Sequence, residues 1–509
     1  MNPIRCVFWA AAFALGVQVP AVHAAAAKSD VARRIESRIQ SGQNVFFVAP
    51  LEGAVYPARF SPPTFSWEVF ADALGKERGA GLGSWRLTIS EEGKVLHEES
   101  ISGPPRWTPP RKLWEIWTGK KLEAEVGNEV NRAIPVHFGI DHQPLPDDAL
   151  FRYIGLAEGA ARPYQPPQSL VWMDPVASKC EDVIRMGSRW PFRCAGCHAT
   201  HSPSGLWSFV DYRFDRKRSY RRSVEIAGAD DSGRPVTRIL DPAGELGGLR
   251  YSFSGEKSAL FMYRPRGTAP EPYPKAYTFI KPRGYKLHAE AFNKRYVSPF
   301  WDIVIADRAT GELVPLKGAA DAAAVETFPS WSADDKRVAF VRNEGMGKMD
   351  IYTVEYNGGK GGQAQPLAGA SGNGSDNYFP EFSPDGRWLA FTRGNASGGP
   401  FARDSSDIYI VPAAGGRARR LESNVEGVMD SWHSWSSDSR WLLYSSKRDG
   451  LATRAYITRI DERGGASAPV ELGCEQGVNA RVNMPQWIKK GRPPAFSDDE
   501  LDELQRRNP

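Results

Sequence analysis

Bulky apolar and polar residues alternate in short stretches along the second half of the chain, separated by turns rich in Gly, Ser and Asp. Three of these stretches are FPSWSADDKRVAFVR, FPEFSPDGRWLAFTR and WHSWSSDSRWLLYSS, which begin at Phe328, Phe379 and Trp432. Alternation with a period of two is typical of β-strands. A second strand, a Gly-rich turn and a short final strand follow each stretch, and the final strands end at Leu367, Leu421 and Leu472.

The spacing of equivalent aromatic residues sets the period of this repeat. These residues are spaced by 51, 53 and 52 positions and are Trp331, Phe382, Trp435 and Trp487. Towards the N-terminus Phe253 takes the same role 78 residues before Trp331, and a Pro-, Gly- and Lys-rich insertion accounts for the excess. One more step of 52 residues reaches His201. Six repeats of four short strands predict a six-bladed β-propeller.

The sixth repeat is truncated after Trp487, so its remaining strands must come from elsewhere in the chain. We expect them from the segment before the first repeat, which includes the strand-like SLVWM at Ser169–Met173. Strands from both ends of the chain would then close the ring. Cys180 and Cys474 could form a disulfide at the same seam, although two unrelated buried thiols are the alternative.

An all-β chain of two domains follows from these patterns. Residues 43–160 contain short alternating segments separated by Pro and Gly, which predict an immunoglobulin-like β-sandwich. The remaining expected parts are an approach segment with the ring-closing strand at 165–193, the propeller at 194–490 and a C-terminal tail at 491–509.

The repeats resemble those of the TolB-like propeller family, whose pattern PxWSPDGRxLAF, DIYxV and GG is matched over roughly residues 190–490. The stretch DSWHSWSSDSRWLLYSSKRDG is the most specific part of the match. The whole chain further resembles exported bacterial proteins with a c-type haem motif at the start of such a propeller. This resemblance implies an architecture and says little about activity.

The N-terminus carries the features of a secretory signal peptide. Arg5 precedes an apolar run from Cys6 to Val19, and small residues near Ala24 suit a cleavage point, so residues 1–24 are expected to be removed. No later apolar run is long enough to span a membrane. The net charge of +5 on 509 residues gives no support to nucleic-acid binding. We therefore expect an exported, periplasmic monomer.

The stretch RCAGCHATHSPSG, from Arg193 to Gly205, places a C-x-x-C-H motif at the start of the first repeat. In this motif Cys194 and Cys197 would add to the vinyl groups of haem, and His198 would coordinate the iron. The spacing predicts one covalent haem c. A zinc site would need a second pair of Cys or His ligands, which the sequence lacks, and a thioredoxin-like dithiol would need a βαβ context.

The second axial ligand of the iron is expected from a neighbouring repeat. Met484 is the first candidate, because the sixth repeat neighbours the first in a closed ring and Met484 matches His198 in the repeat alignment. His433, Met186, His288 or an open position are the alternatives, and Met484 could instead be a core residue. By this alignment His198 is equivalent to Phe328, Phe379, Trp432 and Met484.

These features predict a periplasmic monohaem c-type cytochrome that acts in electron transfer or redox sensing, with the propeller as a docking surface. Its partner would be an unknown redox or envelope protein. A protein-binding scaffold with a structural haem, or a haem enzyme with an open iron site, is the alternative, so the sequence does not decide whether the protein is an enzyme. Hydrolase activity is not favoured, because the G-x-S-x-G nucleophile motif is absent.

Overall fold

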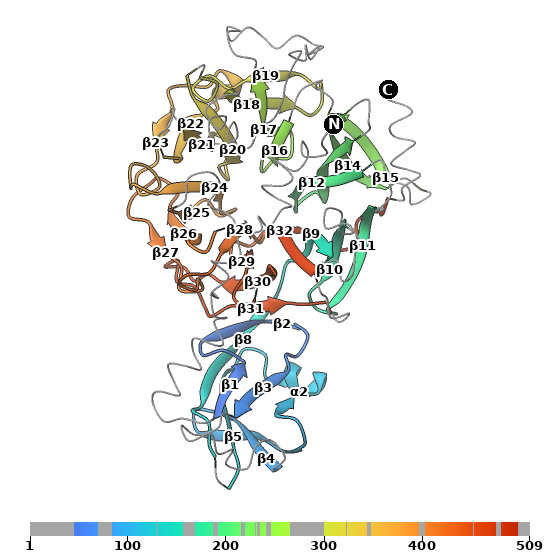
Figure 1. The fold of residues 1–509 in the computed structure, drawn as a ribbon, viewed down its shortest axis with the longest axis vertical. Helices are drawn as coiled ribbons and strands as arrows, with labels where there is room; N and C mark the ends of the chain where they lie inside the picture. The colour runs from blue at the N-terminus through green and yellow to red at the C-terminus, as the bar shows by residue number, and fades with distance from the viewer. Residues whose placement is uncertain are drawn as a thin grey trace, which may run out of the picture.

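The computed structural model of this protein is almost entirely β-structure (Figure 1). It describes residues 45–69, 84–129, 131–155, 168–186, 192–214, 219–229, 231, 235–240, 246–264, 300–321, 323–343, 348–395, 403–450, 452–474 and 480–496. The expected signal peptide at 1–24 and the candidate ligand His288 lie outside these residues. Within the described ranges, helices are too short or too polar to cross a lipid bilayer.

Six antiparallel four-stranded sheets form a ring, which confirms the predicted six-bladed propeller (Figure 1). Blade 1 contains β12 (Phe192–His201), β13 (Leu206–Phe214), β14 (Ser219–Ala229) and β15 (Pro235–Leu240). Blade 2 contains β16 (Leu246–Tyr251), β17 (Lys257–Arg264), β18 (Phe300–Asp307) and β19 (Leu313–Pro315). Blade 3 contains β20 (Val325–Trp331), β21 (Arg337–Asn343), β22 (Asp350–Glu355) and β23 (Gln365–Pro366), with a short 3-10 helix at Asn357–Gly359.

The other three blades complete the ring. Blade 4 contains β24 (Asp376–Phe382), β25 (Trp388–Gly394), β26 (Asp407–Pro412) and β27 (Arg419–Arg420). Blade 5 contains β28 (Asp430–Trp435), β29 (Trp441–Ser446), β30 (Arg454–Arg459) and β31 (Val470–Leu472). Blade 6 contains β32 (Ala480–Lys489), β9 (Asp147–Gly155), β10 (Gln168–Asp174) and β11 (Lys179–Met186). The first-named strand of each blade lies innermost, around the axis of the ring (Figure 1).

Blade 6 joins the two ends of the propeller chain. The C-terminal strand β32 pairs with β9 from Ala480 opposite Gly155 to Lys489 opposite Asp147. The strand β10 contains the segment Ser169–Met173, so the predicted source of the ring-closing strands is confirmed. A disulfide between Cys180 and Cys474, with Cα atoms 5.6 Å apart, links the same seam.

The propeller extends further at both ends than the sequence indicated. The strand β9 belongs to blade 6, so the sandwich ends before Asp147 and the expected boundary at residue 160 is wrong. At the other end Phe496 bridges to Ile184 of β11, and its ring lies 6.2 Å from that of Trp207 and 6.1 Å from that of Phe209. The expected tail at 491–509 therefore begins as part of the propeller core.

The turns between first and second strands hold neighbouring blades together. Asp335 of blade 3 accepts hydrogen bonds from the backbone of Phe253 and Ser254 in blade 2, at 2.6 and 2.8 Å. Blade 6 has no such turn, because its first two strands come from opposite ends of the chain. There Asp147 accepts from the backbone of Ser437 in blade 5 at 2.6 Å and from the hydroxyl of Ser202 in blade 1.

The N-terminal domain is a β-sandwich of two sheets. One sheet contains β1 (Val45–Ala49), β3 (Phe65–Val69) and β6 (Arg106–Trp107). The other contains β2 (Ala54–Ala58), β8 (Val136–Pro144), β7 (Lys121–Gly127), β4 (Ser84–Glu91) and β5 (Lys94–Ser102), and the short helix α2 spans Arg111–Ile116. Four fully buried tryptophans fill its core: Trp67, Trp85, Trp114 and Trp117. An immunoglobulin-like classification of this sandwich stays a prediction.

The sandwich packs against blades 5 and 6 through one continuous apolar core, which includes Trp441 and Trp487 of the propeller. Charged groups reinforce this junction. Asp141 of β8 accepts from Arg440 at 2.5 Å and from Arg459 at 2.6 Å, and both arginines belong to blade 5. The backbone N–H of Ala468 also donates to the carbonyl of Gly53 at 3.2 Å. The two domains therefore form one packed unit.

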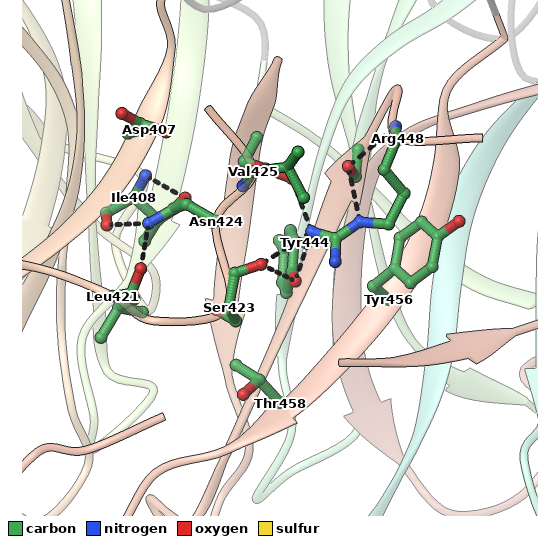
Figure 2. A network of polar contacts seen from close by, with 12 residues as sticks. Asp407, Ile408, Leu421, Ser423, Asn424, Val425, Tyr444, Arg448, Tyr456 and Thr458 are labelled. Carbon is green, nitrogen blue, oxygen red and sulfur yellow. Dashed lines mark hydrogen bonds and ion pairs between the residues drawn. The ribbon is translucent and has the colours of Figure 1, made fainter. Parts of the chain in front are cut away.

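An arginine near the end of the second strand stacks on a tyrosine in three blades, and in blade 5 this arginine is buried. In blade 5 Arg448 donates to Asp430 at 2.9 Å and to the hydroxyl of Tyr444 at 2.9 Å, and its guanidinium lies 4.5 Å from the ring of Tyr456. Figure 2 shows Arg448 between these tyrosines and close to Ser423. Arg342 in blade 3 and Arg393 in blade 4 stack on tyrosines in the same way. These networks stabilise the interior of the blades.

Candidate functional site

The innermost strand of every blade carries a β-bulge at the same position. The strand register shifts between Gly196 and Ala199 in blade 1, and equivalent shifts occur in all six blades. The first bulge residues are Cys197, Gly248, Phe328, Phe379, Trp432 and Met484. The second are His198, Leu249, Pro329, Pro380, His433 and Pro485. A bulge redirects side chains and often lies beside a functional site.

Four bulky residues at the first bulge position have left-handed backbone conformations. Their φ angles lie between 51° and 55°, and they are Phe328, Phe379, Trp432 and Met484. A bulky side chain with positive φ is strained and persists only where its surroundings fix it. The rings of Phe328 and Phe379 meet edge to face at 4.5 Å, which joins blades 3 and 4 near the axis.

The pairing of the first and second strands shows that the predicted alignment of His198 with the other repeats is wrong by one residue. Tyr251 pairs with Ser258 as Trp331 pairs with Val338, so Tyr251 and not Phe253 is the equivalent aromatic residue of blade 2. Because the length of the insertion in the second repeat is not fixed by the period, counting positions did not reveal this error. Cys197, not His198, therefore matches Met484. The structural equivalents of His198 are Leu249, Pro329, Pro380, His433 and Pro485.

The two histidines at the second bulge position are buried and neutral. His198 is 0% exposed and His433 is 4% exposed. Burial, with the charge of Arg250 as a further cause, lowers the pKa of His198 to about 3. Burial likewise lowers the pKa of His433 to about 4. Both imidazoles can therefore donate one hydrogen bond and accept another.

Each of these rings lies against the preceding blade. His198 of blade 1 faces the backbone of Leu150 and Met484 in blade 6, and His433 of blade 5 faces the backbone of Phe379 and Ala390 in blade 4. The structure thus brings Met484 next to His198, but through its backbone. His433 lies against a different pair of strands, and Met186 ends β11 outside the residues whose side chains are described.

The residue types at the seam fit covalent haem, and the described contacts do not test it. Cys194 pairs with Tyr212 in the regular ladder of β12, and Cys197 falls in the bulge. Their side chains lie outside the described part of the chain. His198 is a neutral imidazole, which is the form that binds iron. Groups of three metal-binding side chains are absent among the described residues.

The residue after each bulge forms a ring about the axis, which we call the axial ring. Its members are Ala199, Arg250, Ser330, Glu381, Ser434 and Gln486. Several contact the next blade: the hydroxyl of Ser330 accepts from the backbone of Phe382 at 3.2 Å, and Glu381 accepts from that of Trp435 at 3.0 Å.

Arg250 is the central charge of the axial ring. Burial raises the pKa of Glu381 in blade 4, and Arg250 in blade 2 opposes that rise. Arg250 also lowers the pKa of His433 in blade 5. Arg152 of β9, which is fully buried, also lowers the pKa of His198.

The sequence analysis missed Arg250, Glu381, Arg152 and Asp147. A signal existed for two of them, because Arg250 and Glu381 are charged at a position where the other repeats carry Ala, Ser or Gln. The first two repeats were aligned in the wrong register, so a comparison of the repeats did not show that contrast. Arg152 and Asp147 gave no repeat signal, since β9 was assigned to the sandwich.

Comparisons with known proteins found partial similarities. No protein-family model matches the chain. The uncharacterised peptidase YuxL of Bacillus subtilis is 32% identical over 120 residues, which cover 23% of this chain and only 16% of that protein. TolB from Acinetobacter baumannii has a TM-score of 0.43 at 13% identity, covering 73% of this chain and 80% of its own. A puromycin-hydrolysing peptidase of Mycobacterium tuberculosis has a TM-score of 0.36 at 14% identity. The match covers 70% of this chain and 50% of that protein.

These matches correct the functional prediction. The curated protein that matches is named a peptidase, and none of the reported matches is named a c-type cytochrome. The prediction of electron transfer or redox sensing is therefore wrong. The C-x-x-C-H motif led to it because the motif specifies a cofactor attachment, whereas activity depends on the surrounding site.

Proposed function

We propose that this chain is a peptide-binding protein whose ligand contacts the partly exposed charged residues of the axial ring. The observation that carries the proposal is the electrostatic influence of one partly exposed axial-ring residue on groups in two other blades. Arg250 of blade 2 acts on the ionisation of Glu381 in blade 4 and of His433 in blade 5. Ionisable groups that perturb one another are typical of binding sites.

Peptides are favoured as the ligand class by two features. The relative with 32% identity is called a peptidase, which supports a peptide as the kind of molecule handled by this propeller type. The first bulge position also places bulky apolar residues, Phe328 and Trp432 among them, on the innermost strands beside the axial ring. Binding is proposed rather than hydrolysis, because the G-x-S-x-G motif of propeller-associated serine peptidases is absent from the sequence.

The test is retention of peptides by the immobilised, exported chain. A synthetic heptapeptide library with free termini is applied, and the retained peptides are identified by mass spectrometry. Arg250→Ala and Glu381→Ala, at the two partly exposed positions of the axial ring, should abolish retention. Thr310→Trp, on an exposed turn, should leave it unchanged. Thermal unfolding establishes that each variant is folded. Retention that is equal in all four proteins, or absent from the wild type, contradicts the proposal.

Covalent haem c at the seam is a separate proposal about a cofactor. Cys194 and Cys197 would hold it through thioether bonds and His198 would be the protein ligand of its iron, with Met484 the first candidate for the second ligand. The chain, exported by a host with cytochrome c maturation, should retain haem through acid-acetone extraction. The variant Cys194→Ala/Cys197→Ala should retain none. Loss of all haem from the wild type under this extraction excludes covalent attachment.

Export to the periplasm is proposed on the signal-peptide features of residues 1–24. The disulfide between Cys180 and Cys474 is consistent with an oxidising compartment. N-terminal sequencing of the protein from a periplasmic extract should start after Ala24.

A further inference from the structure

We infer that the contact site of Phe496, where blade 6 meets blade 1, is a docking site for an extended peptide of a partner protein, and that residues 491–496 occupy it as a built-in competitor. These residues follow β32, and we call them the C-terminal strap. The partner peptide would share the chemistry of the strap, RPPAF: an arginine, two prolines and, four positions after the arginine, an aromatic residue. This inference concerns a different part of the molecule from the axial ring and does not depend on the proposed function.

The first half of the strap crosses blade 6 from its second strand to its outermost strand. The backbone N–H of Gly491 donates to the carboxylate of Asp148 in β9 at 2.8 Å. The guanidinium of Arg492 pairs with Glu181 in β11 at 2.7 Å and donates to the carbonyl of Asp182 at 3.2 Å. These contacts lie outside the strand ladder of blade 6, because β32 ends before the strap begins.

Phe496 ends the strap in an apolar site between blades 6 and 1. Its backbone N–H donates to the carbonyl of Val183 at 2.7 Å, and it forms a parallel bridge with Ile184 of the outermost strand β11. Phe496 is 5% exposed, and its ring lies edge to face against Trp207 and Phe209 of β13. An edge strand that receives an extended segment, with an apolar site for one side chain, is a recurrent way of binding peptides.

Displacement of the strap leaves other partners for the carboxylates that it contacts. Glu181 keeps its ion pair with Lys179, and Asp148 keeps the hydrogen bond from the indole N–H of Trp172 at 3.0 Å. The two prolines of the strap have no N–H to donate, so the strap cannot continue a ladder along β11. It is therefore held at its two ends and by its attachment to β32, which keeps it at a high effective concentration. A peptide that contacts more of the edge of β11 can replace it.

The contacts of the strap also define the partner. The ring of Phe496 completes an apolar core shared by the two blades, to which Leu170 and Trp207 belong. Removal of that ring leaves a space that costs free energy until another aromatic ring fills it. Glu181 is 27% exposed, so a basic residue can reach it from solvent. An acidic residue at the same position of the peptide would be repelled.

The test uses the hexapeptide GRPPAF, the sequence of the strap, with an N-terminal fluorescein and a C-terminal amide. Fluorescence anisotropy measures its binding to the full-length wild type and to the full-length variant Arg492→Ala/Phe496→Ala, whose strap has lost both anchoring side chains. The variant should bind the peptide at least about tenfold more tightly than the wild type, in which the strap competes. The hexapeptide GRPPAA, which lacks the aromatic ring, should not bind the variant.

The matched control is Phe391→Ala, which also removes a buried phenylalanine, but from the core between blades 3 and 4. It should bind GRPPAF no better than the wild type, because its strap is intact. Thermal unfolding shows which variants are folded. If Arg492→Ala/Phe496→Ala does not fold, hydrogen exchange of the wild type decides: an excess of GRPPAF should raise the deuterium uptake of residues 491–496, and GRPPAA should not.

The outcomes separate this site from the axial ring. A peptide held at the axial ring would bind the wild type and the strap variant equally, because neither substitution lies on that ring. Equal binding of GRPPAF by both proteins, binding of GRPPAA as tight as that of GRPPAF, or unchanged deuterium uptake in the wild type overturns the inference. None of these results bears on the proposed function.

Discussion

At the residue scale, one backbone position of the propeller carries different chemistry in different blades. The second bulge residue is proline in blades 3, 4 and 6 and histidine in blades 1 and 5. The same burial that suits a proline ring keeps His198 and His433 neutral. A side chain that costs stability at this position is consistent with a binding role.

His433→Pro should reduce the sensitivity of the fold to acid. The pKa of His433 is about 4 in the folded protein against 6.5 for a free histidine. As the pH falls from about 6.5 to 4, the unfolded chain takes up a proton that the folded chain refuses, so the free energy of unfolding falls by at most about 1.4 kcal/mol per pH unit. Urea unfolding between pH 7 and 4 should show a shallower decline for the variant.

The backbone at this position already accommodates Pro380, which follows a residue with φ of 52°, close to the 55° of Trp432 before His433. The substitution should therefore fold. Parallel pH profiles for the variant and the wild type would show that His433 is not a buried neutral group.

Arg448→Met should destabilise the fold by about 3–5 kcal/mol, because it leaves the carboxylate of Asp430 buried and without its cation. Arg387→Met is the matched control: its ion pair with Asp385 is exposed, and its loss should cost less than about 1 kcal/mol. Urea unfolding at pH 7 measures both. A similar cost for the two variants would mean that the network in Figure 2 contributes no more than a surface pair.

At the scale of elements, blade 6 is the point where the ring depends on pairing between distant segments. No turn connects β32 to β9, so the strand ladder, the bonds of Asp147 and the disulfide hold the seam. The other five blades are each built from consecutive strands. Loss of the seam would expose the edges of blades 5 and 1 together with blade 6.

Cys180→Ser/Cys474→Ser should lower the free energy of unfolding by about 2–5 kcal/mol, because the disulfide closes a loop of 294 residues in the unfolded chain. Urea unfolding of the wild type with dithiothreitol should match the double variant, and the reductant should not affect the variant. If reduction leaves the wild type unchanged, the bridge does not hold the seam.

At the scale of the whole molecule, the sandwich and the propeller share a core. The apolar cluster runs from Trp85 in the sandwich to Trp441 in blade 5 without interruption, and Asp141 bonds two arginines across the junction. A shared core predicts cooperative unfolding of both domains. It also fixes the sandwich on the outer side of blades 5 and 6, away from the axis (Figure 1).

Calorimetry of the wild type should show one unfolding transition. Asp141→Ala should lower the stability by about 1–3 kcal/mol, because it removes charged hydrogen bonds to Arg440 and Arg459 at the junction. Glu115→Ala, which removes an exposed pair with Arg111, should change it by less than about 1 kcal/mol. Two separate transitions in the wild type would show that the common core does not couple the domains.

Much of the fold was determined by the sequence itself. The alternation of apolar and polar residues, the turn residues and the period near 52 fix six blades, because each blade is a local unit that cannot bury its faces without neighbours. The truncated sixth repeat even indicated that Ser169–Met173 closes the ring. Cys180 and Cys474 were left open at that stage, and the folded chain places them within bonding distance.

Only the tertiary structure decided the register near the axis and the site built there. A bulge or an insertion changes which residues face each other without changing the period, so counting aligned His198 with Met484 when the ladder aligns it with His433. The electrostatic influence of Arg250 on Glu381 and His433 has no local cause in the sequence. It arises because the closed ring brings blades 2, 4 and 5 to a common axis, and that closure depends on contacts between the two ends of the chain.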